Sequence, residues 1–390
     1  MIVGVDASNI RTGGGLTYFS QLLHAAEPGR NGIEKIAVWA KASTLEQLPR
    51  FPWLDLHHVP LLDRSLPYRL FWQKWLFPKL AQGCDLVFVP GSNAPYRLRP
   101  MVTVSHNMLP FESKELFRYG FSLMTLRLLL LRWGQGRTFR RADGVIFLSR
   151  YARDSISKSV SVAGVATIIP HGIQDVFRMP PRPVRPLDAC SEDAPLRLLY
   201  VSIVDLYKHQ QSVAEAVATL RGKGLPVVVD FVGPAYGPAL KRLRAKFREL
   251  DPEGSFLHYR GPVPHVELRH WYRDADLFIF ASSCENLPNI MIEAMSAGLP
   301  IASSNHPPMP EVLGDAGVYF DPRDAEEIAE VVEGLLREAP TRDRLARLAY
   351  EESARYSWKR CAEETLEFIA ERWREHRRDG EQPGSWWSAS

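Results

Sequence analysis

Short apolar segments alternate with helical stretches along most of the chain, and this alternation constrains the fold more than any other feature. The apolar segments predict buried strands, and the helices between them predict a parallel sheet covered on both faces. Six predicted strands come before residue 170: Ile2–Val5, Ile36–Trp39, Leu86–Val89, Met101–Val104, Gly144–Leu148 and Ala166–Ile169. Six more come after residue 195: Leu198–Val201, Val227–Val232, Phe256–Tyr259, Leu277–Phe280, Ile301–Ala302 and Gly317–Phe320.

A proline-rich stretch, Met179–Pro195, separates the two series and predicts a linker. We therefore expect an α/β protein with two Rossmann-like domains that face each other across a cleft. The predicted domains are residues 1–178 and 196–352. A charged helix is expected at residues 353–378, followed by a tail at residues 379–390.

Composition narrows the class of protein. Of 390 residues, 45% are apolar and 24% are charged, which supplies enough core for a globular protein. The net charge of +3 argues against a general nucleic-acid binder. The four cysteines are far apart and lack metal or redox spacing, which favours a reducing cytosol. The chain starts directly with a predicted strand and has no apolar run of about 20 residues, so we expect a cytoplasmic protein without signal peptide or membrane span.

Two glutamates, Glu285 and Glu293, stand eight positions apart after the predicted strand Leu277–Phe280. Good helix formers surround Glu293, and Gly298 and Pro300 predict the end of that helix. The two carboxylates would lie roughly 8–12 Å apart, with free N–H groups of the helix start nearby. Carboxylates accept hydrogen bonds from hydroxyls, so this spacing suits a diphosphate flanked by two hydroxyl-bearing groups. The alternative is a half-exposed helix with two solvated acids.

Other candidates also follow predicted strands. Residues 13–15 are three glycines, which allow close approach of backbone to a ligand, or simply a tight turn. His106 follows Met101–Val104 and is suited to bind a hydroxyl or transfer a proton, although a single histidine is often structural. Lys208 follows Leu198–Val201 and is either a diphosphate ligand or a solvated lysine. Ser149–Tyr151 and Pro170–Ile173 occupy similar positions, where turns explain them equally well.

Two segments, residues 64–79 and 114–141, mix basic, aromatic and apolar residues. This composition suits helices that lie on an anionic membrane surface. Ordinary core helices whose arginines face water would have the same composition, and both interpretations stay open.

The segment from Glu285 to Ile301 resembles the Glu-x7-Glu motif of family 4 retaining glycosyltransferases, which have the GT-B fold. The resemblance extends over nearly the whole chain and implies transfer of a mannose-, rhamnose- or glucose-type hexose with retained anomeric configuration. The donor would be a GDP-, UDP- or dTDP-linked sugar. No cofactor is expected, and because no Asp-x-Asp pair follows a predicted strand we expect no metal.

The resemblance also implies roles for individual residues. Glu293 would hold the ribose hydroxyls, and Glu285 would lie near the donor sugar and its diphosphate. Lys208 would neutralise the leaving diphosphate, and His106 would contact the sugar near the reacting carbon. The implied catalytic residues are His106, Lys208 and Glu285; the implied donor-binding residues are Gly14, Gly15, Ser202, Lys208, Val263, Glu285, Asn286, Leu287, Pro288, Asn289 and Glu293.

One position departs from the family pattern. A Gly-Arg pair usually precedes the lysine, whereas this chain has Ser202 and Ile203. An arginine from elsewhere would then have to contact the diphosphate, and Arg11 and Arg150 are the candidates. Ser202 would donate one hydrogen bond.

The expected acceptor is a glycan or a lipid-linked glycan of a cell-envelope polysaccharide: an O-antigen, a lipopolysaccharide or an exopolysaccharide. The expected location is the cytoplasm, where the basic segments would contact the inner face of the cytoplasmic membrane. No nucleic-acid partner is expected. Two alternatives remain at this point: a nucleotide-sugar epimerase of the same fold, and a sugar-nucleotide binding protein without turnover.

Overall fold

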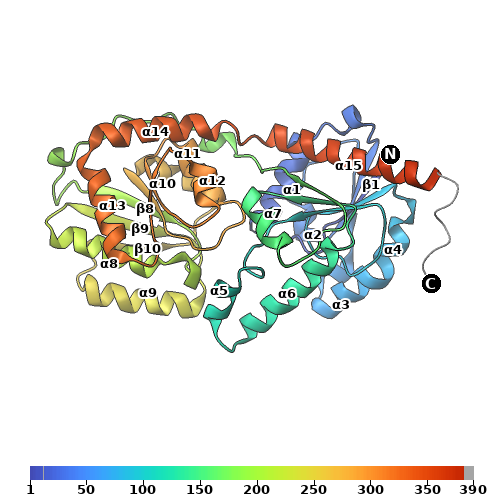
Figure 1. Ribbon diagram of the computed structural model, residues 1–390, viewed down its shortest axis with the longest axis horizontal. Helices are drawn as coiled ribbons and strands as arrows, with labels where there is room; N and C mark the ends of the chain where they lie inside the picture. The colour runs from blue at the N-terminus through green and yellow to red at the C-terminus, as the bar shows by residue number, and fades with distance from the viewer. Residues whose placement is uncertain (12, 382–390) are drawn as a thin grey trace. The chain divides into compact units, whose positions relative to one another are not determined.

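The computed structural model describes residues 1–11 and 13–381, and its contacts divide the chain into two compact units (Figure 1). The first unit consists of Met1–Phe111, Phe121–Gly172 and the chain from Ser357 onward. The second consists of Glu112–Gly120 and Ile173–Tyr356. Thr12 in the predicted glycine loop and residues 382–390 of the predicted tail lie outside the described residues.

The first unit contains a seven-stranded parallel sheet in the order β3-β2-β1-β4-β5-β6-β7. Its strands are β1 Ile2–Asp6, β2 Lys35–Ala40, β3 Leu54–His58, β4 Leu86–Val89, β5 Met101–Ser105, β6 Gly144–Phe147 and β7 Val165–Ile168. Strand β3 was not predicted, because it is an edge strand whose polar residues Asp55, His57 and His58 interrupt any apolar run. The other six strands were predicted to within two residues at each end.

The helices of the first unit include one long helix from the C-terminal part of the chain. They are α1 Gly14–Ala25, α2 Ala42–Leu45, α3 Leu66–Phe71, the π-helix η3 Trp72–Leu76, α4 Phe77–Leu80, α6 Leu123–Phe139, α7 Arg150–Ser157 and α15 Trp358–Glu381. Short 3-10 helices occur at Pro28–Asn31, Pro60–Asp63 and Ala81–Gly83. Helix α15 packs tightly on the sheet because Gly144 has no side chain: a Cβ there would come within 2.7 Å of the Phe368 ring.

The second unit contains a six-stranded parallel sheet in the order β10-β9-β8-β11-β12-β13. Its strands are β8 Leu196–Val201, β9 Val227–Val232, β10 Leu257–Gly261, β11 Leu277–Phe280, β12 Ile301–Ser304 and β13 Val318–Phe320. All six were predicted. Its helices are α5 Ser113–Leu116, α8 Gln210–Gly222, α9 Gly237–Leu250, α10 Leu268–Asp274, α11 Asn289–Ser296, α12 Met309–Leu313, α13 Ala325–Arg337 and α14 Ala339–Ser353, with 3-10 helices at Phe117–Tyr119, Asp175–Phe177, Leu187–Ala189, Leu206–Lys208 and His265–Glu267.

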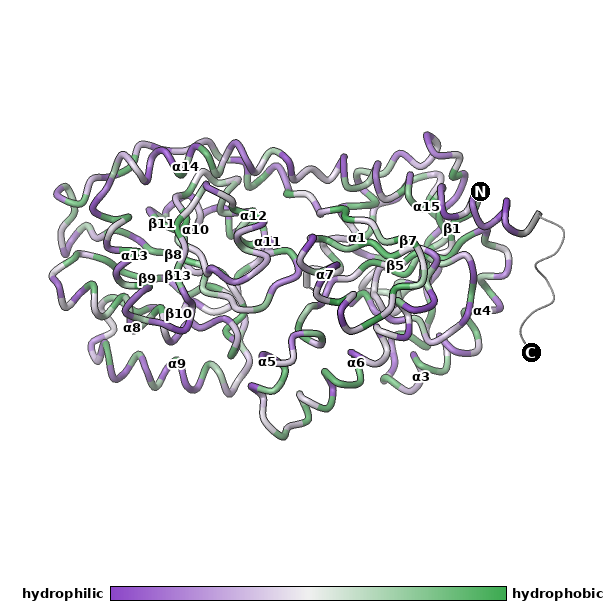
Figure 2. The backbone as a smooth tube through the Cα atoms, viewed as in Figure 1, coloured by the Kyte–Doolittle hydropathy of each residue, from purple (hydrophilic) through white to green (hydrophobic). Residues whose placement is uncertain are grey.

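The apolar strands form the centre of each unit, as the hydropathy colouring of Figure 2 shows. Because all strands of a sheet run parallel, the loops that follow their carboxyl ends gather at one edge. The predicted site residues lie in such loops or in the helices that follow them, each within its own unit. None of the described helices has the length and apolar character that crossing a membrane requires.

Gly172 allows the chain to return to the first unit at the start of α15. A Cβ at this position would come within 2.0 Å of the Trp358 backbone nitrogen, and backbone cannot move aside cheaply. We expect Gly172→Ala to destabilise the protein by about 1–3 kcal/mol in chemical unfolding. Gly83→Ala is the matched control, because a Cβ there meets nothing within 4 Å. Equal stability of the two variants would contradict this packing.

Candidate active site

A buried ion pair joins two loops of the second unit. Lys208 lies after β8 and Glu285 after β11, and the Lys208 ammonium contacts the Glu285 carboxylate. The two side chains are only 8% and 16% exposed. The ammonium also lies 5.1 Å from the Tyr207 ring and 5.2 Å from the Phe280 ring, so cation–π attraction adds to the pairing. Burying both charges is costly, so this pair is poorly explained by stability alone and indicates a functional site.

His209, directly after Lys208, fixes the loop at the start of α8. Its backbone is left-handed, with φ of 48°, which is unusual for a residue with a side chain. Its Nε2 lies 2.9 Å from the Ser283 hydroxyl oxygen, and the Ser283 N–H donates to the Tyr207 carbonyl at 2.9 Å. Burial, followed by the positive charges of Arg118 and Arg323, lowers the pKa of His209 to about 4. The imidazole is therefore neutral near pH 7.

Glu293 lies inside α11 and is 3% exposed. Its Oε1 lies 2.7 Å from His265 Nε2, and its Oε2 accepts a hydrogen bond from the Tyr272 hydroxyl at 2.9 Å. Tyr272 is fully buried, whereas the His265 side chain is 40% exposed. The carboxylate therefore has one interior partner and one partner at the surface.

His106 follows β5 of the first unit and packs edge-on against the Tyr18 ring, with centroids 4.5 Å apart. Burial, together with the charge of His171, lowers the pKa of His106 to about 3, so the ring is neutral. Its Nε2 is shielded from solvent and has no hydrogen-bond partner among the described residues.

The glycine loop lies at the start of α1, in the same unit. Gly13 has a left-handed backbone, with φ of 70°, which glycine adopts without strain. Added Cβ atoms at Gly13 and Gly14 would meet nothing within 4 Å, so the loop is open to a ligand on that side.

Two family models match the chain, one in each half. Glycosyl transferases group 1 matches residues 191–352, and Glycosyltransferase Family 4 matches residues 17–176. The chain belongs to glycosyltransferase family 4. This membership confirms the resemblance seen in the acidic motif.

Curated relatives of this glycosyltransferase include two from Escherichia coli. The chain is 32% identical to O-antigen chain mannosyltransferase B over 118 residues. This matched segment covers 30% of this chain and 31% of the relative. It is 23% identical to serotype-specific mannosyltransferase WbdA over 291 residues. That segment covers 72% of this chain and 34% of the relative. The matched segments thus span about a third of these relatives.

Solved structures share the fold over nearly the whole chain. Sucrose-phosphate synthase from Thermosynechococcus elongatus superposes with a TM-score of 0.75 at 17% identity, covering 97% of this chain and 100% of that one. HepE from Anabaena, solved in complex with UDP and glucose, superposes with a TM-score of 0.69 at 18% identity. The superposition covers 95% of this chain and 100% of HepE. The predicted GT-B class, two doubly wound parallel-sheet units, is confirmed.

The structure brings together some predicted site residues of the glycosyltransferase and leaves others apart. Lys208 and Glu285 are in contact, whereas Glu293 forms hydrogen bonds with His265 and Tyr272. Ser202 donates its hydroxyl to the Ile203 carbonyl at 2.9 Å. Helix α11 begins at Asn289, so Glu285 precedes the helix and Glu293 lies within it.

Sequence reasoning missed His265 and Tyr272. His265 stands two residues after Val263, which was singled out, and the 28-residue separation from Glu293 gave no local signal. Arg118 and Arg323 were also missed as charges near Lys208, although both act on neighbouring His209. The earlier candidate Arg11 donates to the Leu62 carbonyl at 3.0 Å within the first unit.

The hydrogen bond that His265 donates to the Glu293 carboxylate raises the pKa of His265. The folded protein therefore binds this proton more tightly than the unfolded chain does. The stabilisation is fully present below the ordinary histidine pKa of about 6.5 and is lost as pH rises through the raised pKa. We expect His265→Asn to lower the unfolding temperature by about 1–3 °C at pH 5.5 and by less at pH 9.

Scanning calorimetry at both pH values measures this difference. His270→Asn is the control, because His270 is an exposed histidine of α10 whose ring accepts a hydrogen bond from the neighbouring Arg269 and pairs with no carboxylate among the described residues. A His265→Asn effect that does not change with pH would contradict the assignment.

Proposed function

We propose that the chain transfers a hexose from a nucleotide-diphosphate sugar to a glycan or lipid-linked acceptor, with retention of configuration and without a metal ion. The buried Lys208–Glu285 pair at the carboxyl edge of the second sheet carries this proposal. The names of the relatives agree with it, since they include an O-antigen mannosyltransferase and a structure with UDP and glucose.

The nucleotide end of the donor is proposed to bind at Glu293. Its carboxylate would accept hydrogen bonds from the ribose hydroxyls after the half-exposed His265 moves aside, while Tyr272 keeps the carboxylate in place. The nucleobase would contact the half-buried Val263.

The diphosphate is proposed to bind beside Lys208 and the start of α11, near Asn286 to Asn289. The ammonium and the helix N-terminus both favour negative charge, and both are fixed before the donor arrives. Arg118 and Arg323 are our candidates for the guanidinium that Ile203 does not supply, because their charges act on His209 beside Lys208.

In the proposed reaction, the acceptor hydroxyl attacks the anomeric carbon on the face from which the phosphate leaves. The bond from that carbon to the phosphate oxygen breaks, and a phosphate oxygen takes the acceptor proton. Lys208 would stabilise the departing diphosphate. His106 would donate or accept a hydrogen bond at a sugar hydroxyl through its unpartnered Nε2.

The acceptor is proposed to be membrane-borne, as in O-antigen, lipopolysaccharide or exopolysaccharide synthesis. Helix α6 exposes Leu123, Leu126, Leu130 and Trp133, which recur on one helix face and are 54–86% exposed. Phe71 and Trp75 of the α3–η3 region are also exposed. The charge of Arg127 on α6 acts on Arg69 of α3, so the two regions are neighbours. An apolar face with flanking arginines suits an anionic bilayer surface at the cytoplasmic side.

Removing the Lys208 charge tests the transfer reaction. We expect Lys208→Met to lower the rate of nucleotide release from the preferred donor by about 100- to 1,000-fold, because a preorganised charge is lost from the leaving group. GDP-, UDP- and dTDP-linked hexoses, each with a lipid-linked acceptor, form the assay panel. Lys223→Met is the matched control, since Lys223 also pairs with a glutamate, Glu333, but at the surface. Its rate should be unchanged.

Two outcomes of that assay would contradict the proposal. Conversion of the donor sugar without nucleotide release indicates an epimerase. Binding of donors with no reaction by the wild-type chain, with any acceptor of the panel, indicates a binding protein.

Replacing one exposed leucine of α6 tests the membrane surface. We expect Leu130→Ser to weaken binding to phosphatidylglycerol vesicles about five- to thirtyfold in co-sedimentation, because an inserted leucine contributes about 1–2 kcal/mol. Val266→Ser is the control, since Val266 is an equally exposed aliphatic residue of the second unit. Binding of the wild type should also fall with added salt. Equal binding by both variants would exclude this face.

A further inference from the structure

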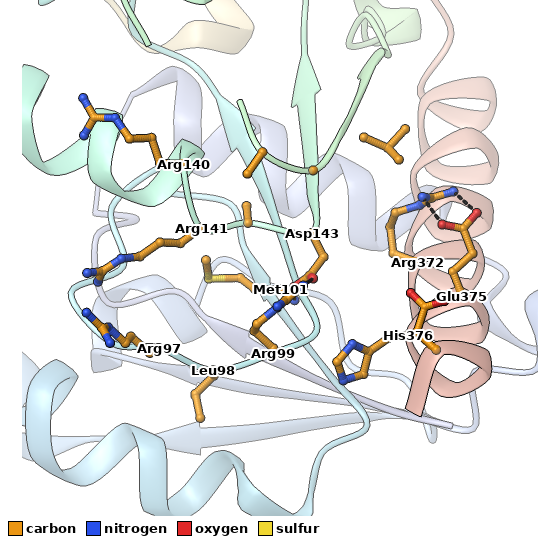
Figure 3. A pocket seen from close by; sticks show the side chains of 15 residues that line it. Arg97, Leu98, Arg99, Met101, Arg140, Arg141, Asp143, Arg372, Glu375 and His376 are labelled. Carbon is orange, nitrogen blue, oxygen red and sulfur yellow. Dashed lines mark hydrogen bonds and ion pairs between the residues drawn. The ribbon is translucent and has the colours of Figure 1, made fainter. Parts of the chain in front are cut away.

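A cavity of about 620 Å³ lies in the first unit, at the opposite edge of its sheet from His106 (Figure 3). Its walls come from the segments before β5, β6 and β7 and from the last turns of α15. Strand β5 has five residues, which places the cavity on the order of 15 Å from its carboxyl end. The volume falls in the range of small-molecule sites. The mechanism proposed above uses none of its residues.

Cationic side chains dominate the lining. Five arginines face three carboxylates: Arg97, Arg99, Arg140, Arg141 and Arg372 against Asp143, Glu375 and Asp379. Two of the arginines are neutralised. Arg99 binds Asp143, with an Nε-to-Oδ1 distance of 2.9 Å, and buried Arg372 binds Glu375, with an Nη2-to-Oε1 distance of 2.7 Å.

The remaining three arginines have no carboxylate partner among the described residues. In Figure 3 the Arg97 and Arg141 side chains extend to the same side of the cavity, with neighbouring guanidinium groups, while the Arg140 guanidinium points away. Arg141 Nη1 is shielded from solvent and has no hydrogen-bond partner in the part of the chain that the structure describes. Burial and the charges of Arg137 and Arg97 lower the pKa of Arg141, which agrees with this proximity. Two adjacent, uncompensated guanidiniums repel each other unless an anion lies between them.

The opposite wall has a different chemistry. Helix α15 contributes Glu375, His376 and Asp379 to the lining, and Figure 3 shows Glu375 and His376 across the cavity from Arg97 and Arg141. Carboxylates accept hydrogen bonds from hydroxyls. We propose that this cavity binds a phosphate monoester carried on a hydroxylated body, with Arg97 and Arg141 holding the phosphate and the α15 carboxylates holding the hydroxyls. A free sugar phosphate and a lipid headgroup of the same kind share this chemistry.

Titration calorimetry of the full chain with glucose 6-phosphate tests the site. Glucose is the uncharged counterpart, and the far-UV circular dichroism spectrum of each variant is the fold control. We expect Arg141→Ala to weaken glucose 6-phosphate binding at least tenfold, because a charge-assisted hydrogen bond is lost. Arg140→Ala is the matched control: it removes the same charge one residue away, but from a guanidinium that points elsewhere.

A second arm distinguishes the source of the ligand. Vesicles with phosphatidylinositol 4-phosphate are compared with phosphatidylglycerol vesicles of equal surface charge. If Arg141→Ala loses binding and Arg140→Ala does not, the site is supported. Loss of glucose 6-phosphate binding identifies a free sugar phosphate as the ligand, and loss of vesicle binding identifies a lipid headgroup. Equal losses in both variants, or no binding of either probe by the wild type, would overturn it. Donor binding is a separate measurement, so a failure of the proposed transferase function does not affect this result.

Discussion

The hydrogen-bonded pairing of β8 with β11 is the constraint on which the rest of the candidate site depends. Lys208 and Glu285 are 77 residues apart in the chain, yet they follow neighbouring parallel strands and so meet at one edge. The surrounding core excludes water from this ion pair, and the low dielectric constant there strengthens the electrostatic interactions of both charges. Because both charges are paired before any donor arrives, a bound diphosphate would share an existing cation rather than require a new one to be desolvated.

At the amino ends of the strands, an aspartate makes the same contacts in both sheets. Asp143 precedes β6, accepts the Met101 N–H at 2.8 Å and binds Arg99. Asp276 precedes β11, accepts the Arg197 N–H at 2.8 Å and binds Arg185. In each case one carboxylate aligns the neighbouring strand and neutralises one arginine. This shared arrangement explains how the first residues of the neighbouring strands are held. It provides no carboxylate for Arg97 and Arg141 of the first unit among the described residues. We therefore attribute the position of these two arginines to a ligand.

Apolar runs made twelve strands predictable, because most of them are buried on both faces and must be apolar throughout; the edge strands β7 and β10 are only partly buried but still contain short apolar runs. Strand β3 escaped because edge position frees its polar residues from that requirement. Local order also indicated that Glu285 lies in a turn and Glu293 in a helix. The partners of Glu293 were not predictable, since His265 and Tyr272 reach it from a separate loop and helix whose packing no local pattern encodes. The sequence also did not indicate which arginines of the cavity lack a carboxylate partner, because Arg141 lies in a segment that is basic throughout.

The two partners of Glu293 explain how a buried carboxylate remains usable. Tyr272 is enclosed and donates to one oxygen, so it holds the carboxylate plane in a fixed direction. His265 is half-exposed and packs at a tilt against the Phe177 ring, with ring centroids 4.9 Å apart, so it covers the other oxygen from the surface. In the proposed binding mode, a ligand hydroxyl that replaces His265 exchanges one hydrogen bond of the Glu293 carboxylate for another. The desolvation of Glu293 is therefore completed during folding, and ligand binding does not have to repeat it.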